Sequence, residues 1–356
     1  MTMRRLINLK RVEARRIFTT YALVTGAFVI LQFMSSTKML SSSMRGMLVP
    51  ICAYMVMAVS LNLVVGVLGE LSLGHAGFMS VGAFSGVAAA ILLQNILPFA
   101  PLRLTVAMVV AAAFAALAGF LIGIPVLRLK GDYLAIVTLA FGEIIKSILN
   151  NFYLGVDSGG LHFSMLADNT RLLAGGKLII RGPMGISGIQ KISTFPMGFA
   201  LTLIALAVVF NLVNSRAGRA FMAIRDDRIA AESVGIDITR YKMMAFVTSA
   251  ALAGAAGCLF AMNYSTIVAN KFDFNTSILV LVFVVLGGQG NMLGSIIAAA
   301  ALTILPEKLR QFADYRMLLY AVVLIAAMLG ANNPTVRRFF ERLNPFAQRS
   351  EEEEGV

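Results

Sequence analysis

Eight long apolar runs constrain the fold of this sequence more than any other feature. Each comes close to the roughly 20 mostly apolar residues that a helix needs to cross a bilayer. Of the 356 residues, 58% are hydrophobic and 13% are charged, and the mean hydropathy is +0.82. A water-soluble globule has too little interior to bury so much apolar sequence, so we predict an all-α polytopic membrane protein. The runs cover residues 18–34, 46–68, 72–93, 104–127, 133–152, 196–213, 243–264 and 315–331.

A further apolar stretch, residues 277–305, is too long for one ordinary span. Gly287-Gly288-Gln289-Gly290-Asn291 interrupts it, and runs of glycine break helices because glycine has the largest backbone entropy to lose. Counting 277–289 and 291–305 as two short spans gives about ten transmembrane helices in all.

An even number of spans agrees with the basic residues near both ends of the chain, because basic segments stay on the cytoplasmic side. We therefore expect a cytoplasmic N-terminal segment at 1–17, a transmembrane domain at 18–331 and a cytoplasmic tail at 332–356. The formal charge is +12. Because the basic residues cluster between apolar runs, the expected partner is the lipid bilayer and not nucleic acid. The longest cytoplasmic connection is the loop 214–242.

The sequence carries little that would support catalysis. The only histidines are His75 and His162, and Cys52 and Cys258 both fall inside apolar runs, so neither a metal site nor a catalytic triad is expected. No phosphate-binding loop or dinucleotide motif is present. We therefore expect no enzyme activity and no cofactor in this chain. If it pumps a solute, its energy must come from elsewhere.

Polar residues interrupt the connection between the second and third apolar runs. Ionisable groups at membrane depth are costly and persist where they face a cavity or a partner, which suggests that Asn62, Glu70, Ser72 and His75 line a substrate pathway. The alternative is a hydrated turn with a satisfied core histidine. Glu143 and Lys146 are three residues apart on one helix face and predict an intramembrane ion pair.

Small residues recur at a spacing of four in two of the runs. Gly82 and Gly86 share one helix face, and Ser249, Ala253, Gly257 and Ala261 form a stripe on another. Such stripes let helix backbones approach closely in lipid, where no hydrophobic drive brings helices together. We predict that Gly82, Gly86, Ala253 and Gly257 pack helices against each other.

The cytoplasmic loop predicts a short helix of its own. Asp226 or Asp227 can cap a helix that runs to about Val234, and Gly235 can adopt the left-handed conformation that ends it. Such a helix has small residues on one face and charges of both signs. It could dock into a groove on another protein or lie on the membrane surface.

Three motifs in this order resemble the permease subunits of branched-chain amino acid ABC importers, of the LivM type. The first is Leu71-Ser72-Leu73-Gly74-His75-Ala76, and the last is Val285-Leu286-Gly287-Gly288-Gln289-Gly290 before Gly294. The resemblance extends over residues 46–331. The second motif, in the cytoplasmic loop, comprises Gly218, Arg219, Ala220, Ala223, Ile224, Arg225, Asp227, Ala230, Ala231, Gly235 and Ile236, followed by Lys242.

The resemblance implies an importer of leucine, isoleucine or valine in the bacterial inner membrane. The expected partners are a homologous second permease subunit, two ATPase subunits that bind ATP and Mg²⁺, and a periplasmic substrate-binding protein. The loop 218–235 would couple this chain to an ATPase. The alternatives are an ABC permease for another small polar solute, such as urea or a nucleoside, and an ion-coupled secondary transporter. The coupling residues implied are Arg219, Ile224, Arg225, Asp227, Ala230, Ala231 and Gly235.

Overall fold

The fold is taken from a computed structural model of the chain. It describes residues 3–309 except 38, 40, 130, 158–159 and 166–176, together with the helical residues 321, 322, 325 and 329. Most of the predicted span 315–331 and all of the tail 332–356 lie outside the described residues. Met1–Ala300 form one compact unit, which contains the helix packing and the candidate site.

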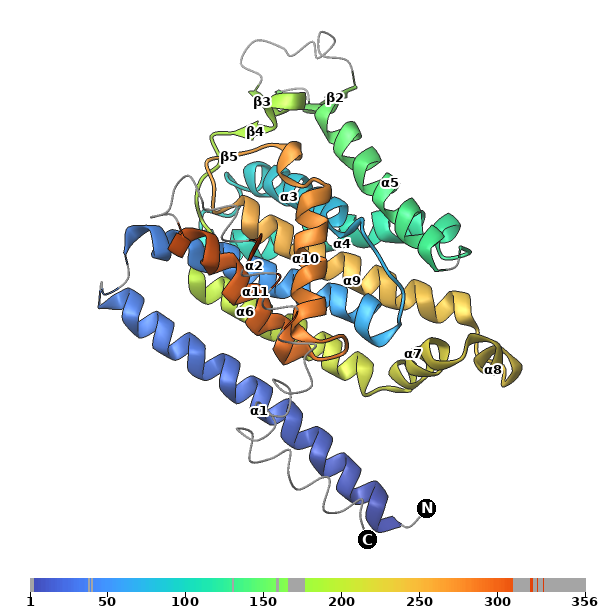
Figure 1. The fold of residues 1–356 in the computed structure, drawn as a ribbon. Helices are drawn as coiled ribbons and strands as arrows, with labels where there is room; N and C mark the ends of the chain where they lie inside the picture. The colour runs from blue at the N-terminus through green and yellow to red at the C-terminus, as the bar shows by residue number, and fades with distance from the viewer. Residues whose placement is uncertain are drawn as a thin grey trace. The chain divides into compact units, whose positions relative to one another are not determined.

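Helices make up most of the described chain, as the apolar runs predict (Figure 1). A π-helical turn, η1 (Leu63–Val67), extends α2, and a 3₁₀ turn, η4 (Ala269–Lys271), precedes α10. The N-terminal helix continues unbroken through the expected boundary at residue 17. The helices are α1 (Met3–Ser36), α2 (Ser42–Asn62), α3 (His75–Leu92), α4 (Ala100–Val126), α5 (Asp132–Asn150), α6 (Phe195–Val213), α7 (Arg216–Asp226), α8 (Arg228–Ser233), α9 (Ile238–Ala261), α10 (Phe274–Gly287) and α11 (Met292–Lys308).

Seven helical segments in the described part of the chain are long and apolar enough to cross a membrane. The predicted number of about ten is therefore approximate. Two other predicted spans form helices that are not among the seven: α5 covers residues 133–150 of the predicted span 133–152, and α11 has 17 residues. The seven segments are Phe18–Ser36, Ser42–Val67, His75–Leu92, Ala100–Val126, Phe195–Val213, Ile238–Ala261 and Ala269–Gly287.

The predicted glycine break separates α10 from α11. Gly288 and Gly290 have φ angles of +89° and +82°, a region that side chains with a Cβ atom rarely adopt. The Asn291 amide donates to the Gly288 carbonyl across this turn. Two short helices therefore replace one long helix, as the sequence predicts.

The helix α9 lies at the centre of the packing, in contact with α2, α3 and α4. A Cβ atom at Gly82 on α3 would collide with the backbone of Gly254 on α9, and one at Gly257 would collide with the Met79 carbonyl. Gly86 faces the Cys258 side chain, and Ala253 is fully buried. The small residues singled out in the sequence thus lie where helices α3 and α9 meet.

The connection 151–195 contains β-strands that apolar periodicity does not reveal. Strands β1 (Tyr153–Asp157), β2 (Gly160–Ser164) and β3 (Lys177–Arg181) form an antiparallel sheet in the order β2-β1-β3. Strand β4 (Ile186–Ser187) pairs with β5 (Thr266–Ile267), which follows α9. Strands of two to five residues are too short to show alternation above background. Figure 1 shows these strands at the opposite end of the helices from α7 and α8. We call the two ends the strand end and the loop end.

The strand end and the loop end should lie on opposite sides of the membrane. Met184, beside β4, is 68% exposed, and Val234, at the end of α8, is 75% exposed. In a variant with Cys52 and Cys258 replaced by alanine, Met184→Cys and Val234→Cys should differ in labelling by a membrane-impermeant maleimide. One should react in intact cells and the other only after permeabilisation. Reaction of both from the same side would contradict this arrangement.

The contact between α3 and α9 has no room for a larger residue at Gly82. We expect Gly82→Leu to lower the free energy of unfolding by about 3 kcal/mol or more, because the leucine meets backbone that cannot rotate away. The matched control is Gly26→Leu on α1, where nothing lies within 4 Å of the place that an added Cβ atom would take. Thermal unfolding in detergent measures both. Equal stability of the two variants would contradict the packing described here.

Candidate functional site

The segment between η1 and α3 is the unusual feature at the centre of the molecule. Residues 68–74 are not helical, yet Leu68 and Ser72 are buried. Gly69 has a φ angle of +80°, which ends the preceding helical turn. In a membrane protein, non-helical backbone is tolerated only where protein or a water-filled cavity satisfies its polar groups. We call residues 66–75 the broken segment.

Side chains from other helices satisfy the backbone at the far end of the broken segment. Thr138 on α5 accepts a hydrogen bond from the Leu73 amide at 3.1 Å, and Ser277 on α10 accepts one from the Ala76 amide at 3.1 Å. A Cβ atom at Gly74 would collide with the Thr138 carbonyl. The segment is thus fixed by α5 and α10 as well as by its own neighbours.

Asn62 joins the broken segment to the break between α10 and α11. This side chain is fully buried at the end of α2. Its amide nitrogen donates to Ser295 Oγ at 2.9 Å, and its oxygen accepts from the Gly290 amide at 2.8 Å. A Cβ atom at Gly66 would collide with the Gly290 backbone. The end of α2 and the start of the broken segment are therefore in direct contact with the last motif.

His75 is a buried residue with a hydrogen-bond partner. Its Nε2 lies 2.8 Å from Ser60 Oγ on α2, and its ring meets Phe78 edge to face. The Ser249 hydroxyl on α9 donates to the Ser60 carbonyl at 2.6 Å. This geometry favours the second of the two interpretations of the sequence, a satisfied core histidine.

Glu70 forms an ion pair with Lys242 at the start of α9. The Lys242 side chain is 1% exposed and that of Glu70 is 14% exposed. Glu70 is therefore not the hydrated turn residue of the alternative interpretation. The two residues are 172 positions apart in the sequence, so no local pattern could reveal the pair.

Arg225 connects the loop between α6 and α9 to the broken segment. Its Nη1 donates to the Gly66 carbonyl at 3.2 Å, and its aliphatic stem lies where a Cβ atom of Gly69 would be. Its other guanidinium nitrogens pair with Asp226 at 3.1 Å. All three motifs that suggested a family from sequence therefore meet at the broken segment.

The loop forms two helices instead of the single short one expected. Ser215 caps α7 by accepting from the Ala217 and Gly218 amides. Asp227 caps α8 by accepting from the Ile229 and Ala230 amides at 2.8 and 3.0 Å. Gly235 has a φ angle of +84° after α8. The predicted cap and the predicted left-handed glycine are both confirmed.

Burial divides the seven coupling residues implied by the sequence into two groups. Ile224 and Ala231 are 5% and 3% exposed, because they face the rest of this chain. Their contact with a partner stays a prediction. The exposed group is Arg219, Arg225, Asp227, Ala230 and Gly235.

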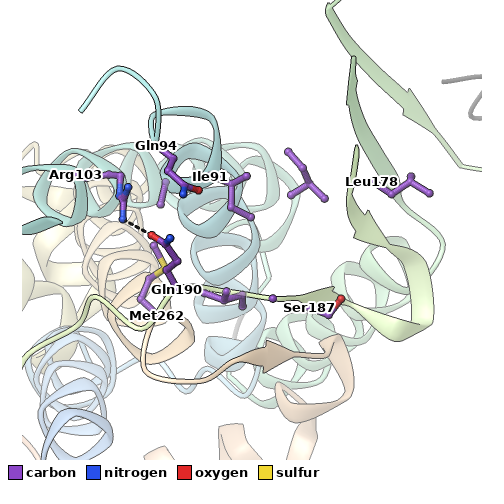
Figure 2. A pocket seen from close by; sticks show the side chains of 11 residues that line it. Ile91, Gln94, Arg103, Leu178, Ser187, Gln190 and Met262 are labelled. Atoms are coloured by element: carbon purple, nitrogen blue, oxygen red, sulfur yellow. Dashed lines mark hydrogen bonds between the residues drawn. The ribbon is translucent and has the colours of Figure 1, made fainter. Parts of the chain in front are cut away.

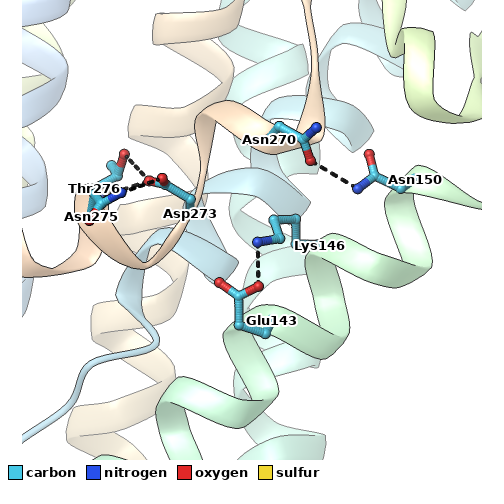
Figure 3. Close-up of polar contacts among 7 residues, drawn as sticks. All are labelled: Glu143, Lys146, Asn150, Asn270, Asp273, Asn275 and Thr276. Atoms are coloured by element: carbon cyan, nitrogen blue, oxygen red, sulfur yellow. Dashed lines mark hydrogen bonds and ion pairs between the residues drawn. The ribbon is translucent and has the colours of Figure 1, made fainter.

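A small cavity lies beside the broken segment, between α3, α5 and the start of α10. Figure 3 shows the polar groups near it. Glu143 and Lys146 form the predicted ion pair on α5, and Asp273 caps α10 through Thr276. Asn150 donates to Asn270 at 3.0 Å. The cavity is lined by Leu73, Gly77, Leu139, Gly142, Glu143, Phe272, Asp273, Phe274 and Ser277.

None of the four predicted pathway residues lines this cavity or a second one at the strand end. Asn62, Glu70 and His75 bond to partners within the chain, while the buried Ser72 hydroxyl has no partner among the described residues. Three of the four belong to the broken segment and Asn62 precedes it, but they do not form one pocket, so their pathway role stays a prediction. Sequence reasoning assigned no site role to Ser60, Thr138, Lys242, Ser277 or Ser295, because isolated serine, threonine and lysine residues carry no pattern.

The fold and the broken segment define a multi-pass helical membrane protein with interrupted helices. A profile of the family "Branched-chain amino acid transport system / permease component" matches residues 43–328. The chain belongs to this family, which consists of transport permeases and not of enzymes.

Curated relatives agree with the family. The chain is 36% identical over 291 residues to the high-affinity branched-chain amino acid transport system permease protein LivM of Escherichia coli K12, and 37% identical to that of Salmonella typhimurium LT2. Each match covers 78% of this chain and 66% of the relative. A shorter match, over 37% of this chain and 41% of the relative, is 28% identical to the autoinducer 2 import system permease protein LsrC of Enterobacter sp. 638. No solved structure is significantly similar.

Because Glu70 and Lys242 form a buried ion pair, the stability of the protein should depend strongly on the presence of both partners. Glu70→Gln should destabilise the protein by about 3–5 kcal/mol, because it leaves the buried Lys242 charge without compensation. The double variant Glu70→Gln/Lys242→Met should recover most of that loss. Thermal unfolding of both single variants and the double variant measures the coupling free energy.

The control for this cycle is Asp226→Asn, which breaks the exposed pair with Arg225. Asp226 is 68% exposed, so the loss should stay below about 1 kcal/mol. A Glu70→Gln variant as stable as the Asp226→Asn control would contradict a buried pair.

Proposed function

We propose that this chain is the membrane-spanning permease subunit of an ATP-binding cassette importer for leucine, isoleucine and valine. Separate partner subunits would bind and hydrolyse ATP with Mg²⁺. The family and the two relatives at 36% and 37% identity support the solute class. The single observation that carries the mechanism is the contact between Arg225 and the broken segment.

We propose that the loop end is cytoplasmic, together with both termini, and that the membrane is a bacterial inner membrane. The exposed surface of α7 and α8 would then meet an ATPase subunit. The strand end would face a periplasmic substrate-binding protein. A homologous second permease subunit would complete the translocation path, and the exposed isoleucines of α5 offer an apolar face for it.

The contacts suggest how a movement of α7 and α8 would be transmitted to the translocation path. A displacement of α7 and α8 pulls on Arg225, whose guanidinium is bonded to the Gly66 carbonyl. Gly66 lies against Gly290, and Asn62 bonds to the same turn. The two helix breaks would therefore move together. Short helices separated by glycine can reorient as units at lower cost than continuous helices.

The ion-coupled alternative receives little support from the carboxylates that suggested it. Such a transporter needs carboxylates along the path that gain and lose protons. Glu70 and Glu143 are each held in an ion pair with a lysine of this chain. An importer for another solute stays a second candidate because LsrC relatives match part of the chain.

Uptake of radiolabelled leucine by cells that lack the chromosomal copy tests this function. The parent chain should restore uptake, and Arg225→Ala should lower it about tenfold or more. A hydrogen bond from a charged donor contributes roughly 1.5–3 kcal/mol, and 1.4 kcal/mol corresponds to a factor of ten. The control is Arg181→Ala, an exposed arginine on β3 at the strand end. Uptake of urea or a nucleoside in place of leucine would contradict the proposed solute.

The exposed position Ala230 tests the contact with an ATPase. Ala230→Cys should crosslink to an ATPase subunit in the purified complex, and Ala230→Trp should abolish ATP hydrolysis that depends on the substrate. Ala231 does not serve for this test, because a tryptophan there would disrupt the loop itself. Met184→Trp at the strand end is the matched control. Normal transport by Ala230→Trp, with no crosslink from Ala230→Cys, would show that the loop does not meet the ATPase.

A further inference from the structure

A second cavity lies at the strand end. It forms where α3 ends, α4 begins and α9 ends, against the stretch that follows β3 (Figure 2). Its polar lining residues are Gln94, Arg103, Ser187 and Gln190. Its apolar wall includes Ile91, Ile189 and Met262.

Arg103 is a buried positive charge that no described carboxylate neutralises. The residue is 5% exposed. Its Nη2 donates to Gln190 Oε1 at 2.9 Å, and its Nε is buried with no hydrogen-bond partner. No carboxylate of the described residues lies within ion-pair distance of it, since the ion pairs found there involve other groups. A guanidinium keeps its charge at physiological pH, and a buried charge without a counter-ion is costly.

The rest of the lining suits an anion. Gln94, Ser187 and Gln190 are exposed, so they form the rim, while Arg103 lies at the floor. The oxygen of Gln190 already accepts from Arg103, so its amide nitrogen remains a donor. No acidic residue lines the cavity. One guanidinium with neutral donors balances one negative charge, and the apolar wall can contact a short hydrocarbon group.

We propose that this cavity binds a small carboxylate monoanion, with Arg103 as its charged donor. Arginine matches a carboxylate geometrically through two parallel N–H groups. The carboxylate could come from a free organic anion or from an amino acid, and both share this chemistry. The inference needs only this chain, so it holds or fails independently of the proposed import function.

The two buried cysteines allow the unfolding of the unmodified protein to be measured. Cys52 and Cys258 are both free and buried, so a dye that fluoresces on reaction with thiols reports unfolding. Sodium acetate should raise the unfolding temperature of the purified chain saturably, by about 2 °C or more, relative to sodium chloride at equal ionic strength. A ligand that binds only the folded state stabilises it in this way. L-Leucine is the second probe.

Arg103→Gln should abolish the shift, and Gln190→Leu, at the exposed rim, should reduce it. The matched control is Arg181→Gln, which removes an exposed arginine from the same end without touching the cavity and should leave the shift unchanged. If Arg103→Gln fails to fold, Gln190→Leu and Arg103→Lys still report on the site, since lysine keeps the charge but loses the paired donors.

Each result decides the inference. A shift with acetate and leucine that depends on Arg103 supports the site and allows an amino acid as the source. A shift with acetate alone supports the site with a free anion as its source. No saturable shift with either probe, or an equal shift in Arg103→Gln, would overturn the inference.

Discussion

The structure depends on how a non-helical stretch of backbone is satisfied inside a chain built to cross membranes. Residues 68–74 cannot bond to themselves as a helix does, and lipid offers no substitute for water. The Thr138 hydroxyl on α5 accepts from the free Leu73 amide, and the Ser277 hydroxyl on α10 accepts from the Ala76 amide in the first turn of α3. These two bonds join α5 and α10 to the end of this stretch and the start of α3.

The same requirement links the two helix breaks. A glycine break alone would leave donors and acceptors exposed at both ends. Asn62, at the end of α2, satisfies the break between α10 and α11, because its oxygen accepts from the Gly290 amide and its nitrogen donates to Ser295. Glycine at 66 lets the two backbones approach closely enough for these bonds to form. The breaks are thus one connected element, and Arg225 attaches the loop to it.

Local features were predictable from sequence because they depend on neighbours in the chain. The glycine break at 287–291, the Asp227 cap and the left-handed Gly235 all follow from backbone preferences within a few residues. The contact of Lys242 with Glu70, by contrast, depends on packing between distant helices. A single sequence holds no pattern that identifies these two residues as partners. The strands after α5 were missed because five residues are too few to establish a period.

The position of Ala231 shows that the small size of neighbouring residues on a helix does not reveal what they contact. Two adjacent small residues suggested a slim surface for a partner, yet they point in different directions on α8. Ala231 is 3% exposed, because a small side chain is what allows a six-residue helix to lie close to its own chain. Ala230 is exposed because α8 turns by about 100° per residue. The small side chain of Ala231 therefore allows close packing within this chain, and that of Ala230 leaves room for another protein. Of the two alanines, only Ala231 is constrained by contacts within this chain. An interaction with another protein would therefore act through the exposed residues of α7 and α8, of which Arg225 also contacts the broken segment.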